Sequence, residues 1–346
     1  MGYKVAIVGA TGAVGEELLK ILEQRSFPIS ELRLLASARS VGKRLEFAGE
    51  ELEVEEARPE SFAGIDIAFF SAGGSVSAKL APEAVKRGTV VIDNTSHFRL
   101  DPDVPLVVPQ INSDDLEGHR GIIANPNCST IIIDLVLAPI LKKAGIKRVV
   151  LATYQAVSGA GAKAMAELDR QVKDYVAGRT SEPQVLPFAS AEKHYPIAFN
   201  LIPQIDVFRE DDYTKEEWKM VKETRKVLHQ PDLRITATAV RVPVFRCHSI
   251  AANVETVESL EVAELKELLA SAPGVTVMDD PARQVYPMPT ELSGRDDVYV
   301  GRIRKDNSTE NGFNLWVVGD QIRKGAALNA VEIGEELDRR GLVRVG

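Results

Sequence analysis

The stretch YKVAIVGATGAVG, residues 3–15, decides the fold of the first half of this chain. Residues 3–8 are a β-branched apolar run, which predicts a buried strand, and a helical pattern at 16–24 follows the glycines. Glycines in such a turn let the backbone approach a pyrophosphate closely, and the phosphates then lie at the helix N-terminus. Because the spacing is G-x-x-G-x-x-G and not the commoner G-x-G-x-x-G, the strand–turn–helix context carries the prediction of a dinucleotide site; the alternative is a purely structural turn.

The end of the second predicted strand indicates which dinucleotide binds. Residues 32–36 form that strand, and Ser37, Arg39, Ser40 and then Lys43 follow it. A site that prefers NAD places a carboxylate here for the ribose 2′-hydroxyl, whereas hydroxyls and cations suit the 2′-phosphate of NADP. We therefore predict NADP, with a solvated basic loop as the alternative.

Further alternation of strands and helices predicts a doubly wound parallel sheet. Strand-like runs lie at 65–70 and 90–93, and between them we expect an alanine-rich helix with Pro82 near its start. Ligands of such sheets bind at the carboxyl ends of the strands. The residues that follow these ends are Ser71, Gly73, Asn94, Thr95 and Arg99. Arg99 suits an anion clamp, although a lone loop arginine is more often simply exposed.

The run NPNCST, residues 125–130, places one of only two cysteines at the start of a helical pattern. Pro126 disfavours helix before it, and residues 131–141 carry apolar residues at helical spacing, so the helix should begin at Asn127 or Cys128. Unpaired N–H groups and the positive end of the helix dipole favour a thiolate there. Cys128 is therefore a candidate nucleophile; the alternative is a cysteine packed as a small hydrophobe.

Composition excludes several classes of protein. A net charge of −8 over 346 residues, with both signs interspersed, offers no basic stripe for nucleic acid and no polybasic segment for a membrane surface. Two cysteines provide no disulfide framework, and the histidines and cysteines form no zinc-ligand pattern. We expect a cytoplasmic protein that acts on small molecules and contains no metal.

A second β-rich stretch and a capped helix follow the cysteine. Residues 148–157 include Gln155 and lead into a glycine turn with Ser158 and Gly159. Thr214 and Glu217 form a capping box that opens an amphipathic helix over 214–228. Within it, Glu216 and Lys219 are one turn apart, and by default such a pair is a solvated salt bridge.

Residues 235–248 read as a run of β-formers that contains Arg241, Cys247 and His248. Adjacent strand residues point to opposite faces, so Cys247 and His248 should diverge, and Cys247 is better explained by packing. His248 shares a cleft with Arg241 if residues 243–246 turn or bulge; its alternative is a structural histidine.

The last third of the chain contributes further strands and a closing helix. Alternating stretches at 298–304 and 314–318 predict strands of a second sheet, and residues 326–337 predict an amphipathic helix.

Taken together, these motifs resemble those of the aspartate-β-semialdehyde dehydrogenases over nearly the whole chain. The matching segments are GATGAVG at 9–15, DNTS at 93–96 with Arg99, NPNCST at 125–130, YQAVSG at 154–159, EEWK at 216–219, RVP at 241–243, RCHS at 246–249 and GDQIRKG at 319–325. The glycine motif alone is unspecific, but the combination is highly specific.

The resemblance implies an NADP-dependent reductive dephosphorylation of L-aspartyl-4-phosphate to L-aspartate-4-semialdehyde, with release of inorganic phosphate, toward lysine, diaminopimelate, threonine and methionine. It implies a Cys128 thioester, with His248 as acid and base. It also implies that Arg241 and Glu216 hold the substrate carboxylate and amino group and that Gln155 orients the acyl end. Arg99 with Lys219 would bind phosphate, and Asn127 would be a further substrate contact. The residues implied against NADP are Gly9, Thr11, Gly12, Ala13, Val14, Arg39, Ser40, Ser158, Gly159 and Gln321, with Ser37, Ser71, Gly73 and Lys43 as further neighbours.

The family fold comprises a Rossmann-like NADP-binding domain and an α/β catalytic and dimerisation domain with a mixed sheet. Here it implies residues 1–127, completed by a C-terminal helix within 325–346, and residues 128–324. A homodimer is expected, with a tetramer as the alternative.

Two other functions remain open from the sequence. N-Acetyl-γ-glutamyl-phosphate reductases share the acyl-phosphate and cysteine chemistry but act on a longer, acylated substrate; Glu216 favours a free ammonium instead. A nucleotide-binding regulator on the same fold would explain the glycines but not Cys128 and His248.

Overall fold

The computed structural model describes residues 2–343. The chain divides into two compact units, residues 1–127 with 325–346, and residues 128–324. Among the described residues no helix is long and apolar enough to cross a membrane. In the same part of the chain no three histidine, cysteine, aspartate or glutamate side chains gather as metal ligands would.

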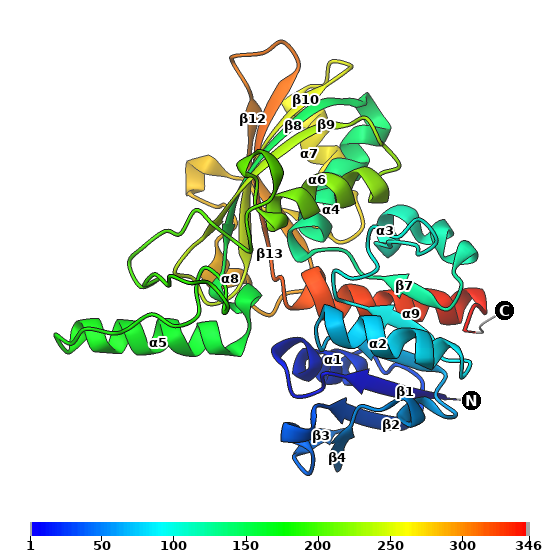
Figure 1. The fold of residues 1–346 in the computed structure, drawn as a ribbon. Helices are drawn as coiled ribbons and strands as arrows, with labels where there is room; N and C mark the ends of the chain where they lie inside the picture. Colours follow the sequence, from blue (N-terminus) through cyan, green and yellow to red (C-terminus); the bar gives the residue numbers. More distant parts are fainter. Residues whose placement is uncertain (1, 344–346) are drawn as a thin grey trace. The chain divides into compact units, whose positions relative to one another are not determined.

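The first unit is built on a seven-stranded sheet (Figure 1). Its strands are β1 (Tyr3–Val8), β2 (Ile29–Ala36), β3 (Arg44–Phe47), β4 (Glu50–Glu56), β5 (Ile67–Phe70), β6 (Val90–Asp93) and β7 (Ile122–Ala124). They lie in the order β3-β4-β2-β1-β5-β6-β7. All neighbours are parallel except β3 and β4, which form an antiparallel hairpin at the edge. The predicted doubly wound sheet is confirmed, and the edge hairpin is an addition that the sequence did not predict.

Helices cover both faces of this sheet. On one face, α1 (Ala13–Gln24) and α9 (Leu328–Arg340) pack into one apolar cluster with β1 and β5. On the other face, α2 (Gly74–Val85) packs into a second cluster with β5 and β6. The short helix α3 (Pro109–Asn112) lies against α9. Pro82 lies in the last turns of α2, so the expectation that it stands near the helix start is wrong.

The side chains of the C-terminal helix α9 form an ion pair and a hydrogen bond with other elements of the first unit. A π-helical turn, Arg323–Ala327, leads into it, so the α-helix begins two residues later than the sequence pattern predicted. Both carboxylate oxygens of Glu335 accept hydrogen bonds from Arg25 at 2.7 Å. Tyr3 donates to Asp338, and this contact raises the pKa of the Tyr3 phenol to about 12.

The second unit is built on a six-stranded mixed sheet. Its strands are β8 (Ile146–Gln155), β9 (Arg234–Arg241), β10 (His248–Thr256), β11 (Val275–Val277), β12 (Val298–Lys305) and β13 (Gly312–Gly319), in the order β11-β12-β13-β10-β8-β9. Strand β9 is parallel to β8, and β10 is antiparallel to β8 and β13.

Helices cover one face of this second sheet (Figure 1). They are α4 (Cys128–Ala144), α6 (Lys215–Val227) and α7 (Val262–Ala270). Helix α5 (Ala162–Val176) extends away from the sheet, and the short α8 (Pro289–Leu292) packs against β13. Strand residues alternate accordingly: on β8, β9 and β10 every second side chain is buried under the helices and its neighbours are largely half-exposed. This alternation is what half-buried strands require, and it fixes which residues face the helices.

Residues 235–248 are divided between two strands, and the turn that a shared cleft of Arg241 and His248 requires lies between them. Strand β9 ends at Arg241, a loop follows, and β10 begins at His248. Cys247 has a left-handed backbone with φ 71°, which lies outside the β region. Strand β8 lies between β9 and β10, so the two are not neighbours in the sheet.

Candidate active site

The ends of three neighbouring strands lie side by side at one end of the second sheet. Gln155 ends β8 and pairs with Arg241, which ends the parallel strand β9. His248 begins β10, whose antiparallel direction brings its first residue beside the last residues of β8. All three side chains lie on the buried, helix-covered face and are at most 3% exposed. The required turn before His248 is present, and the structure brings His248 and Arg241 together.

The backbone of Ala156 contacts both His248 and Arg241. Its N–H donates to His248 Nδ1 at 3.1 Å, and its carbonyl oxygen accepts from Arg241 Nη1 at 2.7 Å. Gly159 lies against the same pair, since a Cβ there would be 2.9 Å from Arg241 Nη1 and 3.2 Å from His248 Nε2. Sequence patterns gave no sign of Ala156, because a backbone group acts through its position and not through its side chain.

Burial shifts the pKa values of both His248 and Arg241. Burial, and next to it the charge of Arg241, lowers the pKa of His248 to about 3, against the opposing effect of Glu216. Burial also lowers the pKa of the Arg241 guanidinium, against the opposing charges of Glu216 and Cys128. A pKa this low favours the uncharged form of His248 near neutral pH. Because the charge of Cys128 acts on the guanidinium of Arg241, these two side chains lie near each other.

The two cysteines have different environments. Cys128 is the first residue of α4 and is partly exposed, as the sequence predicted for the helix start. Cys247 is fully buried against Leu292 and Val318, and burial raises the pKa of its thiol to about 12. Its packing role is confirmed. Asn127, immediately before the helix, is 6% exposed.

The first turn of α6 brings a buried ion pair to the site. The capping box is confirmed: Thr214 N–H donates to Glu217 Oε2 at 2.6 Å, and Glu217 N–H donates to Thr214 Oγ1 at 3.3 Å. Lys219 Nζ lies 3.0 Å from Glu216 Oε2, and Gln155 Nε2 donates to Glu216 Oε1 at 3.2 Å. Glu216 is 5% exposed, so the default expectation of a solvated surface pair is wrong.

Further acidic and amide groups surround this pair. Lys219 also reaches Asp206 Oδ2 at 3.4 Å, a partner without any motif around it in the sequence. Gln321 is buried: its Oε1 accepts from the N–H of Cys247 at 2.9 Å, and its Nε2 donates to Ser158 Oγ. The structure therefore places Ser158, Gly159 and Gln321 at the loop that leads into His248.

The glycine turn of the first unit has the geometry of a close backbone approach. Gly9 has φ 94°, and a Cβ there would lie 2.9 Å from the backbone and side chain of Ser71. Gly12 is the N-cap of α1, which places Ala13 and Val14 in its first turn. Gly73, with φ 98°, is the N-cap of α2. Two helix N-termini therefore follow the adjacent strands β1 and β5, an arrangement suited to a pyrophosphate.

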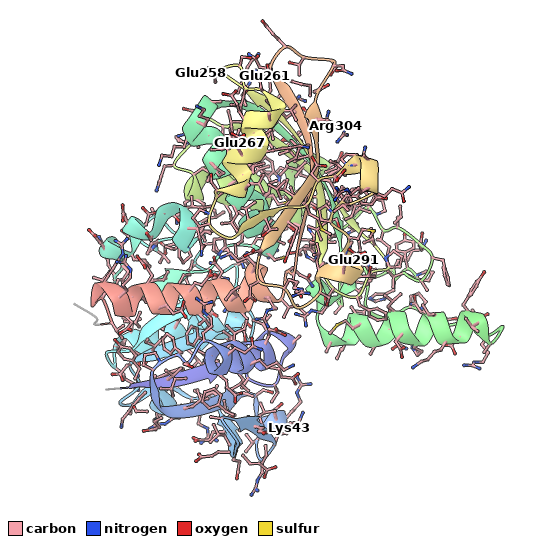
Figure 2. All side chains as sticks on the ribbon, turned by 180° about the vertical axis from the view of Figure 1, so that it is seen from behind. Lys43, Glu258, Glu261, Glu267, Glu291 and Arg304 are labelled. Atoms are coloured by element: carbon pink, nitrogen blue, oxygen red, sulfur yellow. The ribbon has the colours of Figure 1, made fainter. Side chains whose placement is uncertain are left out.

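The loop after β2 joins this turn. Thr11 Oγ1 and Ser40 Oγ are 3.3 Å apart, in a hydrogen bond that links the glycine turn to the 3₁₀ turn Ala38–Ser40. Ser37 and Arg39 are exposed there, and Figure 2 shows Lys43 at the surface of the same unit. The predicted hydroxyls and cations thus gather beside the glycine turn.

Arg99 is a buried residue of the first unit, not a solvated loop arginine. It is 7% exposed, and it donates from Nε to the Asn125 carbonyl at 2.9 Å and from Nη2 to the Asn94 carbonyl at 2.7 Å. Asn125 Nδ2 in turn donates to Asn94 Oδ1 at 2.8 Å. The run after β6 and the run before Cys128 are joined through Arg99. Lys219, its expected partner at phosphate, belongs to the second unit.

Comparison with known proteins gives a consistent family assignment. The model of the semialdehyde dehydrogenase NAD-binding domain matches residues 4–119, and that of the semialdehyde dehydrogenase dimerisation domain matches residues 137–324. The aspartate-semialdehyde dehydrogenase of Bacillus subtilis is 54% identical over 99% of both chains, and that of Aquifex aeolicus is 55% identical over 99% of this chain and all of its own. A crystal structure of aspartate semialdehyde dehydrogenase II from Vibrio cholerae, complexed with ASA, superposes with a TM-score of 0.93 at 45% identity, covering 98% of this chain and 99% of that one.

Proposed function

The chain belongs to the aspartate-semialdehyde dehydrogenase family, and on this premise we propose that it catalyses the reversible NADP-dependent reductive dephosphorylation of L-aspartyl-4-phosphate to L-aspartate-4-semialdehyde. The product would serve lysine, diaminopimelate, threonine and methionine synthesis. The observation that carries the proposal is the convergence of Gln155, Arg241 and His248 with Cys128 and Glu216 in one unit. A reactive thiol suits the reducing cytoplasm, where we place the enzyme.

Cys128 is the proposed nucleophile. In the reductive direction its thiolate attacks the acyl carbon, the C–O bond to phosphate breaks, and a thioester forms on the enzyme. Its position at the first residue of α4 supports this role, because helix N-termini favour negative charge. Gln155, fixed by its hydrogen bond to Glu216, would orient the acyl group.

Charged side chains of the site match the rest of the substrate. The planar guanidinium of Arg241 suits the α-carboxylate, and its Nε has no hydrogen-bond partner among the described residues. Glu216 supplies a carboxylate for the ammonium group. Arg99 and Lys219 would bind phosphate, with Asn127 beside the nucleophile; two cations suit a dianion.

The first unit fits NADP. When bound, NADPH supplies the hydride that reduces the thioester. Gly9, Thr11, Gly12, Ala13 and Val14 would receive the pyrophosphate together with Ser71 and Gly73, because a side chain at Gly9 would fill the space beside Ser71. Arg39 and Ser40, with Ser37 and Lys43, would hold the 2′-phosphate, which the bond between Thr11 and Ser40 brings next to the turn. Ser158, Gly159 and Gln321 are the proposed contacts of the second unit.

A homodimer through the second unit is the proposed assembly, with a tetramer as the alternative. The sheet face that α4, α6 and α7 leave uncovered carries Tyr154, which is 37% exposed, and Trp316, with ring centroids 5.5 Å apart. Beside Trp316 a pocket is lined by Ala251, Pro287 and Arg304, the last of which is labelled in Figure 2. A half-exposed aromatic sheet face of this kind is typical of an interface.

The two competing functions fit less well. Glu216 is a buried carboxylate of the site, and an N-acetylated glutamyl substrate has no ammonium group for it to bind. A non-catalytic nucleotide-binding regulator would not need the buried Arg241 and His248 around a partly exposed cysteine.

The test is phosphate-dependent reduction of NADP by purified protein with L-aspartate semialdehyde, run with NAD in parallel. Cys128→Ala should abolish turnover and spare NADPH binding, whereas Cys247→Ala, the matched control, should leave turnover measurable. Turnover by Cys128→Ala would contradict the thioester. Preference for N-acetylglutamate semialdehyde would favour the reductase, and NADPH binding with no turnover on either substrate would favour the regulator.

A further inference from the structure

The side-chain ammonium of Lys219 lies between two carboxylates of the second unit. Its Nζ is 3.0 Å from Oε2 of Glu216, one turn earlier on α6, and 3.4 Å from Oδ2 of Asp206, which lies in the segment before that helix. Glu216 is buried and also accepts from Gln155. The function proposed above has a use for Glu216 and Lys219 but none for Asp206.

The backbone holds Asp206 beside this helix in an unusual conformation. Its φ is 69°, in the left-handed region that aspartate and asparagine tolerate better than most residues. Its Oδ1 accepts from the N–H of Val207 at 2.9 Å, and the Val207 carbonyl accepts from the N–H of Lys215, the first residue of α6, at 2.8 Å. The carboxylate is thus fixed to the start of the helix that carries Lys219, and its other oxygen contacts that lysine.

A second lysine shares the same carboxylate oxygen. Lys215 Nζ lies 3.8 Å from Asp206 Oδ2, and its side chain is 40% exposed, against 18% for Lys219. The two lysines are four residues apart on α6, so they lie on one side of the helix. When Lys219 turns to another anion, Asp206 keeps Lys215 as its partner, and the exchange leaves the carboxylate paired.

We propose, on the basis of the function proposed above, that Asp206 is a positioning residue that competes with phosphate for Lys219 and thereby weakens phosphate binding. Before phosphate binds, Asp206 neutralises part of the charge of the lysine that must receive the dianion. Once phosphate is bound, the negative charge of Asp206 repels it at short range. Both effects favour release of inorganic phosphate, which the proposed reductive reaction requires at every turnover.

Asp206→Asn tests the charge alone. Asparagine tolerates the left-handed backbone and keeps an oxygen that accepts from Val207, and it removes the negative charge beside Lys219. In the assay with L-aspartate semialdehyde, NADP and phosphate, we expect the KM for phosphate to fall by about three- to tenfold. The KM values for the other two substrates should change by less than about twofold, because the change removes one partly exposed charge that contacts neither of their proposed binding groups.

Two further variants control this experiment. Asp211→Asn removes the same charge from an exposed aspartate that also has a left-handed backbone, with φ 57°, and it should leave the KM for phosphate unchanged. Asp206→Gly keeps the backbone and removes the side chain, and it should reproduce the fall. An unchanged or raised KM for phosphate in Asp206→Asn would overturn the proposal. So would an equal fall in the KM for L-aspartate semialdehyde, since a merely loosened site would affect both substrates.

Calorimetric titration of inorganic phosphate into the full-length protein separates this proposal from the proposed reaction, because it needs no turnover. Tighter binding by Asp206→Asn than by wild type supports the proposal even where L-aspartate semialdehyde is not turned over. Binding that is equal, weaker or undetectable in the variant overturns it even where the enzyme is active. The difference should shrink at high KCl concentration, since salt screens partly exposed charges.

Discussion

The two cysteine thiols of the second unit differ in exposure because of their positions in the fold. Cys128 opens a helix beside a cationic group, while Cys247 is sealed into an apolar cluster. Reactivity requires the thiolate and access to it, and only Cys128 has access. Two glycines also differ in their surroundings. A Cβ at Gly159 would meet two side chains of the site, whereas a Cβ at Gly118 would have nothing within 4 Å.

Alkylation should separate the two cysteines. At pH 8 we expect iodoacetamide to modify Cys128, with activity falling in proportion, and to leave Cys247 unmodified until the protein is unfolded. The reason is that burial raises the pKa of the Cys247 thiol to about 12, so that its thiolate is negligible at this pH. Peptide mass spectrometry over time checks this. Equal rates at both sites would show that the buried cluster opens readily.

Gly159→Ala should damage catalysis more than stability. The added methyl group would lie 2.9 Å from Arg241 Nη1 and 3.1 Å from His248 Cε1, so both side chains must move. Misplacement on this scale costs on the order of 10²-fold in rate. Gly118→Ala, with nothing within 4 Å of the new methyl, is the matched control. Steady-state kinetics with thermal melting test it, and unchanged kcat/KM for Gly159→Ala would mean that the loop yields.

Arg39→Glu should reduce the preference for NADP. A carboxylate beside Ser40 and Thr11 would repel the 2′-phosphate, whereas NAD has no phosphate there. We expect kcat/KM with NADP to fall by about tenfold or more, the equivalent of one charge-assisted contact, and that with NAD to fall less. Arg209→Glu, an exposed site in the second unit, controls for net charge. Equal losses with both cofactors would contradict 2′-phosphate recognition.

At the scale of elements, helix α4, which begins with Cys128, packs against helix α6, which carries Glu216. Asp134 of α4 is fully buried and accepts from Thr224 Oγ1 of α6 at 2.8 Å. Burial, and to a lesser extent the charge of Glu223, raises the pKa of Asp134 well above its usual range. The contact between these helices therefore involves a carboxyl group that favours its neutral form.

Asp134 should make folding stability fall as pH rises. Its pKa is higher in the folded than in the unfolded state, so the folded state binds more protons, and stability decreases upward from the unfolded pKa near 3.8. Asp134→Asn keeps the shape and acceptor but removes the titration. We expect this variant to gain stability relative to wild type in urea unfolding as the pH rises from 4 to 8. Asp169→Asn, exposed on α5, is the control and should show no such trend. Parallel curves for Asp134→Asn and wild type would mean that Asp134 ionises freely.

Local patterns predicted the elements better than their pairing. The apolar run at 3–8 was sufficient to predict strand β1, and the capping box at Thr214 was sufficient to predict the start of helix α6. Both patterns depend only on residues that are neighbours in the sequence. The sequence did not predict where the first strand within 235–248 ends and the next begins, because β-formers continue through the loop. Cys247 takes its left-handed backbone where Gln321, distant in sequence, accepts from its N–H.

The site was predicted as a set of side chains but not as a geometry. Arg241 and His248 meet because β8 lies between β9 and β10, a pairing that no local pattern encodes. The burial of Glu216 and Arg99 likewise follows from tertiary packing. The catalytic use of each residue stays a prediction until the variants above are measured.

At the scale of the whole molecule, the open face of the second sheet should govern assembly. Replacing Trp316 by Glu puts a charge among half-exposed aromatic groups, and we expect it to raise the dissociation constant of the proposed homodimer at least tenfold. Analytical ultracentrifugation measures this. Val257→Glu, at an exposed apolar residue beyond the end of β10, is the control. A Trp316 variant that remains dimeric would place the interface elsewhere.

The backbone of one residue, Ala156, anchors both His248 and Arg241 of the site. A displacement of this loop would therefore move Arg241 and His248 together and leave the distance between them unchanged. With Arg241 as the proposed site of the substrate carboxylate, this fixed distance would select substrates by the length of their carbon chain. A homologue one methylene longer would place its carbonyl group out of register with His248, even where its carboxylate binds equally well.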